Sequence, residues 1–356
     1  MEKFDTSEYK ITYILGAGAS AHALPTVKDI MDEDNKKIKS YGFAYSLRNF
    51  AFDLQRDKNI IPKFSPFVEK MSKDMLWLAE NSDKFGTPDT YAKYLYLKDR
   101  NLLSKLKETL AFYFITEQFI KQKNDERAKI FLTSVMQIGA VFPTNIKIIN
   151  WNYDFQIQLA GEIFRNETYH HGGNASVHTP PLITYYPGVG DELKINFHIS
   201  DSKNISMVHL NGIAGFYYHN EESIIYNDFI DGNLKDMNYL IEKFTNDSNN
   251  KEYLITFAWE EGTEADNFLR MRMDIATSIV AKTDVLIIVG YSFPFFNRKI
   301  DKQIFEALKT SGKLKKIIYQ DPYKSGDFLR KQFGISEDIE IINSKVTNNY
   351  YLPDEL

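Results

Sequence analysis

Five short apolar runs in this chain each end in a polar or glycine-rich cluster whose side chains could bind or activate a ligand. Near-continuous apolar runs are typical of strands that are buried on both faces, as in a parallel sheet. Ligands of such sheets lie outside the carboxyl ends of the strands, so the clusters predict one shared site, most simply for a nucleotide. The apolar runs cover residues 12–15, 146–149, 205–208, 285–289 and 316–319.

The first cluster, residues 16–20, begins the dinucleotide-binding pattern through Gly16, Gly18 and Ala21, because alanine can replace the third glycine. Glycine permits a tight turn and a close approach of the backbone to a pyrophosphate, whose charge the next helix N-terminus stabilises. The alternative is a purely structural turn between strand and helix. No ribose-binding acid stands at a second strand tip about twenty residues on, which argues against a dehydrogenase.

The next two clusters place polar side chains two residues apart. Asn152 and Asp154 can hold a ribose hydroxyl and position a water, and the alternative is an Asx turn that caps the following helix. His209 and Asn211 lie on an extended segment and therefore face the same way. The imidazole can act as a general base or grip a ribose; the alternative is a polar residue satisfied by its neighbours.

We expect the elements that must position these clusters to form one α/β domain over residues 1–356, a Rossmann-like parallel sheet with helices on both faces. Helical spacing of apolar residues between about 40 and 140 predicts a large helical insertion. Glycine and proline predict an irregular excursion at about 166–204 that folds over the site as a lid. Further helices are predicted at 238–244, 264–282, 297–310 and 326–333, and a sixth strand at 339–342.

Composition excludes several function classes. The chain has no cysteine, which excludes disulfides, a thiolate nucleophile and thiolate-ligated zinc. The net charge is −5 and no long basic block occurs, so we expect no direct nucleic-acid binding. The sequence shows neither a membrane-length apolar run nor a signal peptide, so we expect a cytoplasmic protein without membrane association. His170 and His171 are adjacent on an irregular segment, and we expect no metal there.

The ordered motifs together resemble a known family. Gly16-Ala-Gly-Ala-Ser20, Asn152-x-Asp154, the 209–212 element and Gly290-Tyr-Ser292 follow the order of the sirtuin-type NAD-binding fold. The 290–297 segment with Asp301, and the 85–89 segment, resemble signatures of its bacterial branch, the sirtuin-like domains of antiphage defence systems. The resemblance covers the sheet elements over most of the chain and is loose in the helical insertion and the excursion.

The resemblance implies roles for the matched positions. Asn152 and Asp154 match the pair implicated in the nicotinamide ribose and in placing the attacking water. The family's catalytic histidine stands just before a glycine, where this chain has Asn211. Either His209 substitutes from about 6.5 Å along the same face, or the site lacks its base. The implied NAD-binding residues are Gly16, Ala17, Gly18, Ala19 and Ser20 for the pyrophosphate, then Asn211, Asn297, and Gly290, Ser292 and Asp321 toward the adenosine half.

The implied function is cleavage of NAD to nicotinamide and ADP-ribose, as the effector of a bacterial antiphage defence system that depletes NAD. Protein-deacylating sirtuins carry a four-cysteine zinc module, so a chain without cysteine points away from deacylation and from structural zinc. The alternative is a non-catalytic module that binds NAD or ADP-ribose as a sensor or assembly platform. By analogy with relatives, we expect a homo-oligomer and an activating partner encoded nearby, an ATPase or an Argonaute-like protein.

Overall fold

The structure is a computed structural model, and it describes residues 9–31, 38–137, 141–169, 182–187, 205–219, 223–226, 236–245, 251–260 and 271–356. Most of the predicted excursion at 166–204, including His170 and His171, lies outside the described residues. The same holds for the first part of the helix predicted at 264–282.

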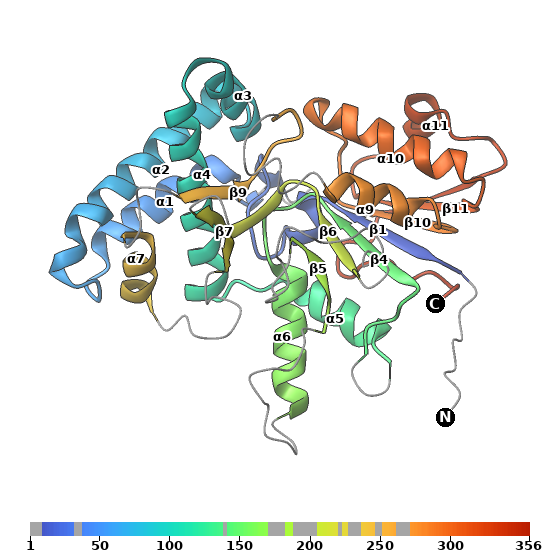
Figure 1. Cartoon of the computed structure of the whole chain (residues 1–356), viewed down its shortest axis with the longest axis horizontal. Coiled ribbons are helices and arrows are strands. Elements are labelled where there is room, and N and C mark those ends of the chain that lie inside the picture. The colour runs from blue at the N-terminus through green and yellow to red at the C-terminus, as the bar shows by residue number, and fades with distance from the viewer. Residues whose placement is uncertain are drawn as a thin grey trace.

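A seven-stranded parallel sheet forms the centre of the molecule, in the order β12-β11-β10-β1-β4-β6-β5 (Figure 1). Every residue of β1 and β10 is buried, as two-sided burial of continuous apolar runs requires. The predicted Rossmann-like α/β fold is therefore confirmed. The strands are β1 (Ile11–Leu15), β4 (Ile146–Asn150), β5 (Tyr185–Tyr186), β6 (Met207–His209), β10 (Val285–Val289), β11 (Lys316–Gln320) and β12 (Glu340–Ser344).

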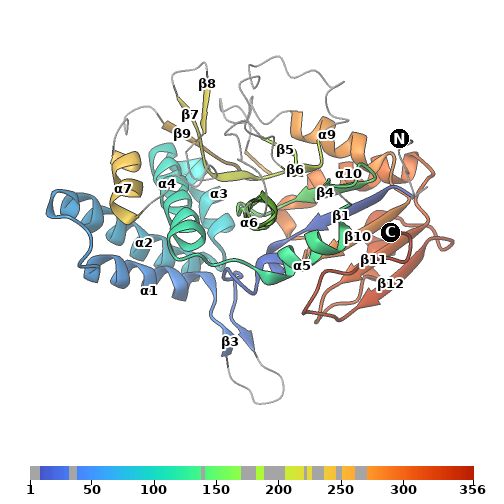
Figure 2. The same ribbon diagram turned by 90° about the horizontal axis from the view of Figure 1, so that it is seen from below.

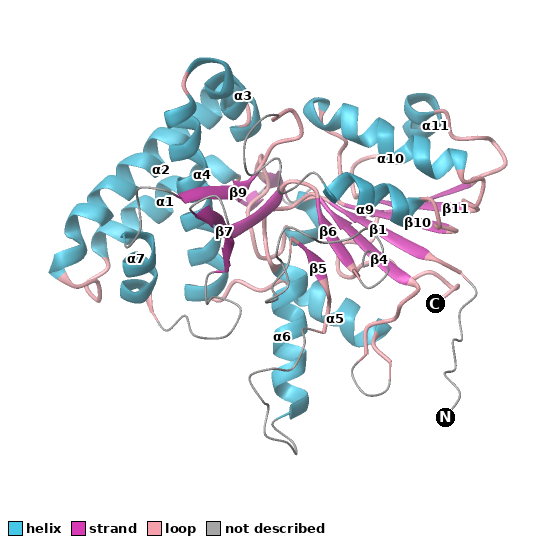
Figure 3. Ribbon diagram, viewed as in Figure 1, coloured by secondary structure: helices cyan, strands magenta, loops and turns pink. Residues whose placement is uncertain are grey.

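Helices cover both faces of this sheet, as Figure 3 shows. One face carries α5 (Glu126–Val135) and α6 (Gln156–Tyr169), and the other carries α9 (Met271–Val280), α10 (Arg298–Thr310) and α11 (Phe328–Phe333). Each layer contributes apolar residues to a separate buried core against the strands. In α10, for example, Ile300, Ile304 and Leu308 form one buried stripe at helical spacing.

β1 lies where the chain reverses its direction across the sheet. The chain leaves β1 toward β4 across the face of α5, whereas it leaves β10 toward β11 across the opposite face. Leu15 pairs with Asn150 of β4 and with Val289 of β10, so the carboxyl ends of these three strands are level. Open α/β sheets bind ligands in the crevice at such a switch point.

The helical insertion forms a second lobe beside the sheet (Figure 1). It contains α1 (Phe43–Arg56), α2 (Ser65–Phe85), α3 (Pro88–Lys98), α4 (Arg100–Ile115) and a π-helical turn, η3 (Thr116–Ile120). Thr87 caps α3 by accepting from the N–H of Thr90, as the Thr-Pro sequence predicts. A three-stranded antiparallel sheet shares this lobe's core with α7 (Met237–Thr245); its order is β8 (Ser223–Tyr226), β7 (Gly212–His219) and β9 (Lys251–Ile255).

The structure refines the predicted boundaries. α5 falls within the 40–140 block but packs on the main sheet, because its Phe131 and Leu132 face the strands. The small antiparallel sheet was not predicted, and α6 continues to Tyr169, into the predicted excursion. A hairpin of β2 (Ile30–Met31) and β3 (Ile38–Ser40) projects below α1 and α5 in Figure 2. None of the helices that the structure describes is long and apolar enough to cross a bilayer.

Candidate functional site

The tips of β1 and β10 touch each other through glycine backbone. Gly18 donates its N–H to the carbonyl of Gly290 at 3.0 Å. A Cβ atom on Gly290 would lie 2.4 Å from the Cα of Gly18, and one on Gly16 would lie 2.6 Å from the Cα of Tyr291. Gly290 also has a φ of +57°, a left-handed conformation that favours glycine. The glycines thus allow two loops to pack together, a use that the sequence pattern does not distinguish from an approach to pyrophosphate.

Buried side chains hold the glycine turn from behind. Arg127 donates to the carbonyls of Gly18 and Ala19 at 3.1 and 2.8 Å, and it pairs with Asp125 at 2.6 Å. Tyr350 donates its hydroxyl to the carbonyl of Ala19 at 2.8 Å. Arg127 and Asp125 are both buried, and a buried ion pair needs such additional hydrogen bonds to offset its desolvation. These contacts fix the position of the turn relative to the strand tips.

Asn152 joins the tip of β4 to the glycine turn. Its amide Nδ2 donates to the carbonyl of Gly16 at 2.9 Å and lies 3.2 Å from the hydroxyl of Ser20. The side chain of Asn150 accepts from the N–H of Asn152 at 3.0 Å, which orients the segment after the strand. Asn152 is only 9% exposed, so these bonds are sheltered from water. The predicted β1 and β4 clusters therefore meet.

Asp154 lies beside Ser20 and is 5% exposed. Burial raises the pKa of the Asp154 carboxyl to about 6, opposed by hydrogen bonds from the Ser20 hydroxyl and the N–H of Gln156, while the charge of Asp125 adds to the rise. The bond from Gln156, at 3.2 Å, is the Asx turn that the sequence offers as an alternative. A carboxyl that titrates near neutral pH is suited to general base catalysis. The turn and that chemistry are compatible.

His209 is fully buried between the main sheet and α6. Its Nδ1–H donates to the carbonyl of Asn152 at 3.1 Å, since a carbonyl can only accept, and its Nε2 then accepts from the amide of Gln158 at 2.8 Å. Burial lowers the pKa of His209 to about 4, so the ring is neutral at neutral pH. Because both ring nitrogens are hydrogen-bonded, His209 holds the backbone carbonyl of Asn152 in place. It offers no free nitrogen for the expected role of general base.

Asn211 and Trp151 carry buried polar atoms without a partner among the described residues. The Nδ2 of Asn211 donates to the carbonyl of Trp151 at 3.2 Å, which leaves Asn211 Oδ1 as an unpaired acceptor. The indole Nε1 of Trp151 is an unpaired donor, and its ring stacks on Tyr291 with centroids 5.4 Å apart. Leaving such atoms unpaired costs about 1–3 kcal/mol each. Both atoms therefore need a polar partner that the described residues do not supply.

Two further acids approach the tips. Tyr291 donates to Asp301 at 2.9 Å and accepts from the amide of Asn297 at 3.0 Å, so Asn297 belongs to this network. Burial raises the pKa of Asp301 to about 8. Asp89, near the N-terminus of α3, lies 3.5 Å from the hydroxyl of Tyr153, and burial raises its pKa to about 6. The helical insertion thus contributes a carboxyl to the site.

The remaining predicted residues lie around this centre. Ala17 and Ser292 are exposed on the two loops that meet over β1. Asp321 accepts from the N–H groups of Tyr323 and Lys324 at 2.8 and 2.9 Å, so it shapes a turn after β11, one strand beyond β10. The predicted residues that the structure brings into direct contact with one another are Gly16, Gly18, Ala19, Ser20, Asn152, Asp154, His209 and Gly290.

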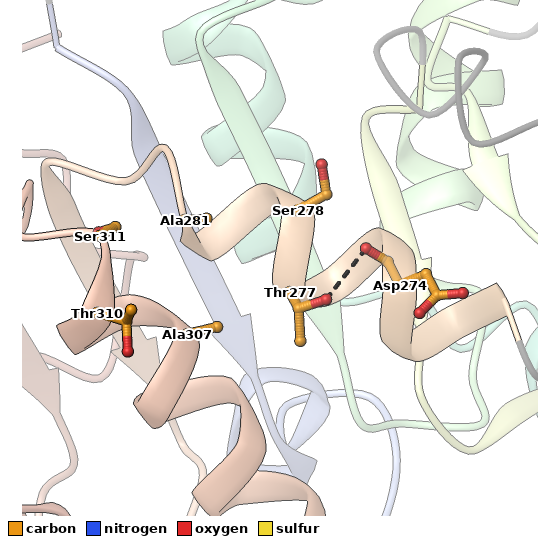
Figure 4. Close-up of a pocket in the computed structure, with 7 residues that line it drawn as sticks. All are labelled: Asp274, Thr277, Ser278, Ala281, Ala307, Thr310 and Ser311. Atoms are coloured by element: carbon orange, nitrogen blue, oxygen red, sulfur yellow. Dashed lines mark hydrogen bonds between the residues drawn. The ribbon is translucent and has the colours of Figure 1, made fainter.

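Two pockets lie near these elements, one beside the segment that follows the glycine turn and one farther from that turn. A pocket of about 410 Å³ is lined in part by residues 21–25, directly after the glycine turn. A depression of about 540 Å³ lies between α9 and α10 (Figure 4). Its small side chains, such as Ala281 and Ser311, stand at the C-terminal ends of these helices, just before β10 and β11 begin. That depression is therefore at the amino edge of the sheet, opposite the polar clusters.

Sequence reasoning missed the residues that support the turn from a distance. A buried role for Arg127 could have been predicted, because it stands four residues before Phe131 on the apolar stripe of α5, where a charged residue is unusual. Asp125 caps the same helix. Asp89 lay within a motif that the resemblance singled out, but nothing in its spacing predicted that it approaches Tyr153.

No group of three or more histidine, aspartate and glutamate side chains forms a metal-binding cluster within the described ranges. Comparisons with known proteins add no assignment, since no family model matches the chain and no curated protein matches it in sequence. Any statement of function therefore rests on the geometry of the strand tips and on the order of the sequence motifs.

Proposed function

We propose that the chain hydrolyses NAD to nicotinamide and ADP-ribose at the carboxyl ends of β1, β4 and β10. One observation carries the proposal. At the switch point of the sheet, Asn152 is bonded to the glycine turn, and Ser20 links it to Asp154, a buried carboxyl with a pKa of about 6. An amide and a near-neutral carboxyl are suited to place and deprotonate a water. The sirtuin-like order of the motifs supports NAD as the substrate.

In the proposed step, the bond between the ribose C1′ and the pyridinium nitrogen breaks, and nicotinamide leaves as a neutral molecule with the bonding electron pair. The oxygen of a water bonds to C1′, and Asp154 takes up the proton that this water loses. Asn152 orients the ribose and the water, while Ser20 and the His209-supported backbone hold the pair in place. Because the leaving group is neutral, positioning and electrostatic stabilisation supply much of the acceleration, and the base adds about 10²–10⁴-fold.

The charge around the tips supports the same substrate. The pyridinium ring of NAD is positive, and positive charge develops on the ribose as the bond breaks. Asp154 and Asp89 both titrate at about pH 6, so both are mostly ionised at neutral pH. Their negative charge favours a cationic ring over the uncharged dihydronicotinamide ring of NADH.

The proposal is tested by incubating the purified full chain with NAD or with NADH, alone and with the product of the neighbouring gene, and measuring nicotinamide by chromatography. We expect nicotinamide release from NAD and none from NADH. Intact NAD under both conditions, at protein concentrations that saturate any assembly, would show that the proposed hydrolysis is wrong.

The buried position of His209 favours a second candidate, a module that binds NAD or ADP-ribose without cleaving it. In this case the two unpaired atoms on Asn211 and Trp151 would serve recognition alone. Calorimetry that finds tight NAD binding, with no nicotinamide released, would support this candidate. Turnover that disappears in an Asn152→Ala variant would exclude it.

The cellular role follows from the resemblance and belongs to the same proposal. An NAD hydrolase of this kind would deplete NAD during phage infection, after activation by a partner or by homo-oligomer assembly in the cytoplasm. Cellular NAD should then fall after infection in cells that carry the chain and its neighbouring gene, and should stay constant in cells that lack the chain. A constant NAD level in infected cells would contradict the defence role without affecting the chemistry.

A further inference from the structure

A polar pocket separate from the strand tips opens on the outer side of the segment that follows the glycine turn. Its volume is about 410 Å³, within the range of small-molecule sites. One wall is residues 21–25, a second is α1 with Tyr41, two residues before it, and the floor lies in η3 and the residues after it. Neither Asn152 nor Asp154 lines it. We call it the tyrosine–lysine pocket, after Tyr41, Tyr45, Lys121 and Lys123.

The α1 wall offers aromatic faces. The rings of Tyr41 and Tyr45 stack with centroids 4.0 Å apart, and the two residues are 46% and 42% exposed. Asn49, four residues after Tyr45 on the same helix face, adds a polar side chain to the wall. Exposed stacked tyrosines beside an amide are suited to a planar ring that carries hydrogen-bonding groups.

The floor of the pocket carries more positive than negative charge. Glu117 is 2% exposed and pairs with both Lys121, at 2.8 Å, and Lys123. Asp53, on the α1 wall, lies 3.8 Å from Lys121; its side chain is 70% exposed, compared with 31% for Lys121 and 44% for Lys123, so water screens its charge the most. Each lysine ammonium has three donors, so both can bind an anion while they hold Glu117. The floor thus favours a ligand with a compact anionic group.

From this lining we propose that the tyrosine–lysine pocket binds a mononucleotide, with the base against Tyr45 and the phosphate at Lys121 and Lys123. The pocket has the polarity and the size for a nucleoside monophosphate. Aromatic stacking and lysine contacts to phosphate are the two interactions that such a ligand uses most.

The pocket is connected to the glycine turn. His22, on its wall, donates its backbone N–H to Asp125 at 3.2 Å, and Asp125 pairs with Arg127, which holds the carbonyls of Gly18 and Ala19. A ligand that orders residues 21–25 therefore stabilises the turn at the strand tips. As a regulatory effect on NAD cleavage this consequence rests on the proposed function, whereas binding itself does not.

Calorimetry of the full chain with AMP tests the proposal, with adenosine and inorganic phosphate as separate ligands. We expect AMP to bind, adenosine to bind about tenfold more weakly and phosphate alone to bind more weakly still. Tyr45→Ala and Lys123→Ala should each weaken AMP binding about tenfold. The matched controls Tyr94→Ala and Lys73→Ala remove an exposed tyrosine and an exposed lysine outside the pocket and should leave binding unchanged.

Asn49→Trp, which fills the pocket from an exposed position and removes none of the aromatic or lysine groups, should also abolish AMP binding. The Asn152→Ala variant distinguishes AMP binding in this pocket from AMP binding at the strand tips. AMP binding that persists in Asn152→Ala and is lost in Asn49→Trp supports the proposal even if NAD is never cleaved. Absence of AMP binding, or binding that is lost in Asn152→Ala and unaffected by the pocket variants, would overturn it.

Discussion

β4 and β6 lie side by side in the sheet, and each ends in two polar residues two positions apart, yet they use these residues differently. At β4, Asn152 and Asp154 reach the glycine turn through Gly16 and Ser20. At β6, His209 is bonded to the backbone carbonyl of Asn152 and to Gln158 of α6. One tip therefore places an amide and a carboxyl at the carboxyl ends of the strands, while the other supports that backbone from within the fold.

The difference comes from the position of each residue relative to the end of the ladder. His209 is itself in the last β4–β6 pair, opposite Asn150, and side chains within a ladder point into the helix layers. Asn152 and Asp154 come after that pair and can turn toward neighbouring tips. Asn211, two residues beyond His209, follows the same rule, since its Oδ1 lies at the tips without a partner in the part of the chain that the structure describes. Distance from the strand end, more than residue type, decides which side chain can meet a ligand.

The largest expected effect is the loss of NAD cleavage when a residue at the β4 tip is replaced. Asn152→Ala removes the bond to Gly16, and nicotinamide release from NAD should fall more than about 100-fold, because a misplaced reacting group costs that much. Asn145→Ala is the matched control, a buried asparagine before the opposite end of β4, bonded to the carbonyl of Tyr9 at 3.2 Å. Its rate should stay within about threefold of the wild type. Equal losses in both variants would show that the effect is one of stability alone.

A second prediction concerns the contact that brings the β1 and β10 tips together. Gly290→Ala would place a Cβ 2.4 Å from Gly18 in a left-handed conformation, and it should lower the free energy of unfolding by about 3 kcal/mol. Gly312 has a similar φ of +63° but no atom within 4 Å of a Cβ. Gly312→Ala should therefore cost only about 1 kcal/mol. Urea unfolding measures both, and equal costs would mean that the loops do not need this close approach.

A third prediction separates the tips by the pH dependence of stability. The pKa of Asp154 is raised from 3.8 to about 6, so the folded state binds more protons and stability falls by about 3 kcal/mol as pH rises through that window. The pKa of His209 is lowered from 6.5 to about 4, so its contribution, also about 3 kcal/mol, is present above pH 6.5 and lost as pH falls to 4.

Denaturant unfolding from pH 4 to pH 8 should therefore change in opposite senses in two variants. Asp154→Asn removes a fall in stability, so its stability should rise more steeply with pH than that of the wild type. His209→Gln removes a rise, so its profile should be less steep. Parallel profiles for the wild type and both variants would contradict the burial of these two groups.

The smallest effect is expected at Ser20. Its hydroxyl lowers the pKa of Asp154, so Ser20→Ala should raise that pKa. The inflection in the rate of NAD cleavage, measured against pH, should then move to higher pH. The free energy of unfolding should change by about 1 kcal/mol, the net worth of an ordinary hydrogen bond. An inflection at unchanged or lower pH would show that Ser20 does not contact the titrating group.

The main sheet could be predicted because β1 and β10 are continuous apolar runs, which only two-sided burial explains. β7 could not be predicted, because its sequence mixes glycine, tyrosine and histidine without an alternation of apolar and polar residues. Its partner β9 also lies far along the chain. α5 was grouped with the helical insertion because periodicity identifies a helix but not the surface on which it packs.

The centre of the site could be predicted in part. Asn152 and Asp154 follow an apolar run directly, so their place at the tip follows from the strand. The hydrogen bonds from Arg127 and Tyr350 to the glycine turn could not be predicted, because they join residues 109 and 331 positions apart. The sequence placed His209 and Asn211 on one face, but it did not show that the ladder ends between them.

The pH dependence of NAD cleavage tests most directly whether the reactive group stands at β4 and not at β6. The rate should increase with pH through an inflection near 6, where Asp154 loses its proton. Asp154→Asn should remove that inflection and lower the rate about 100-fold or more. His209→Gln should keep the inflection. An inflection that survives in Asp154→Asn and disappears in His209→Gln would contradict the account.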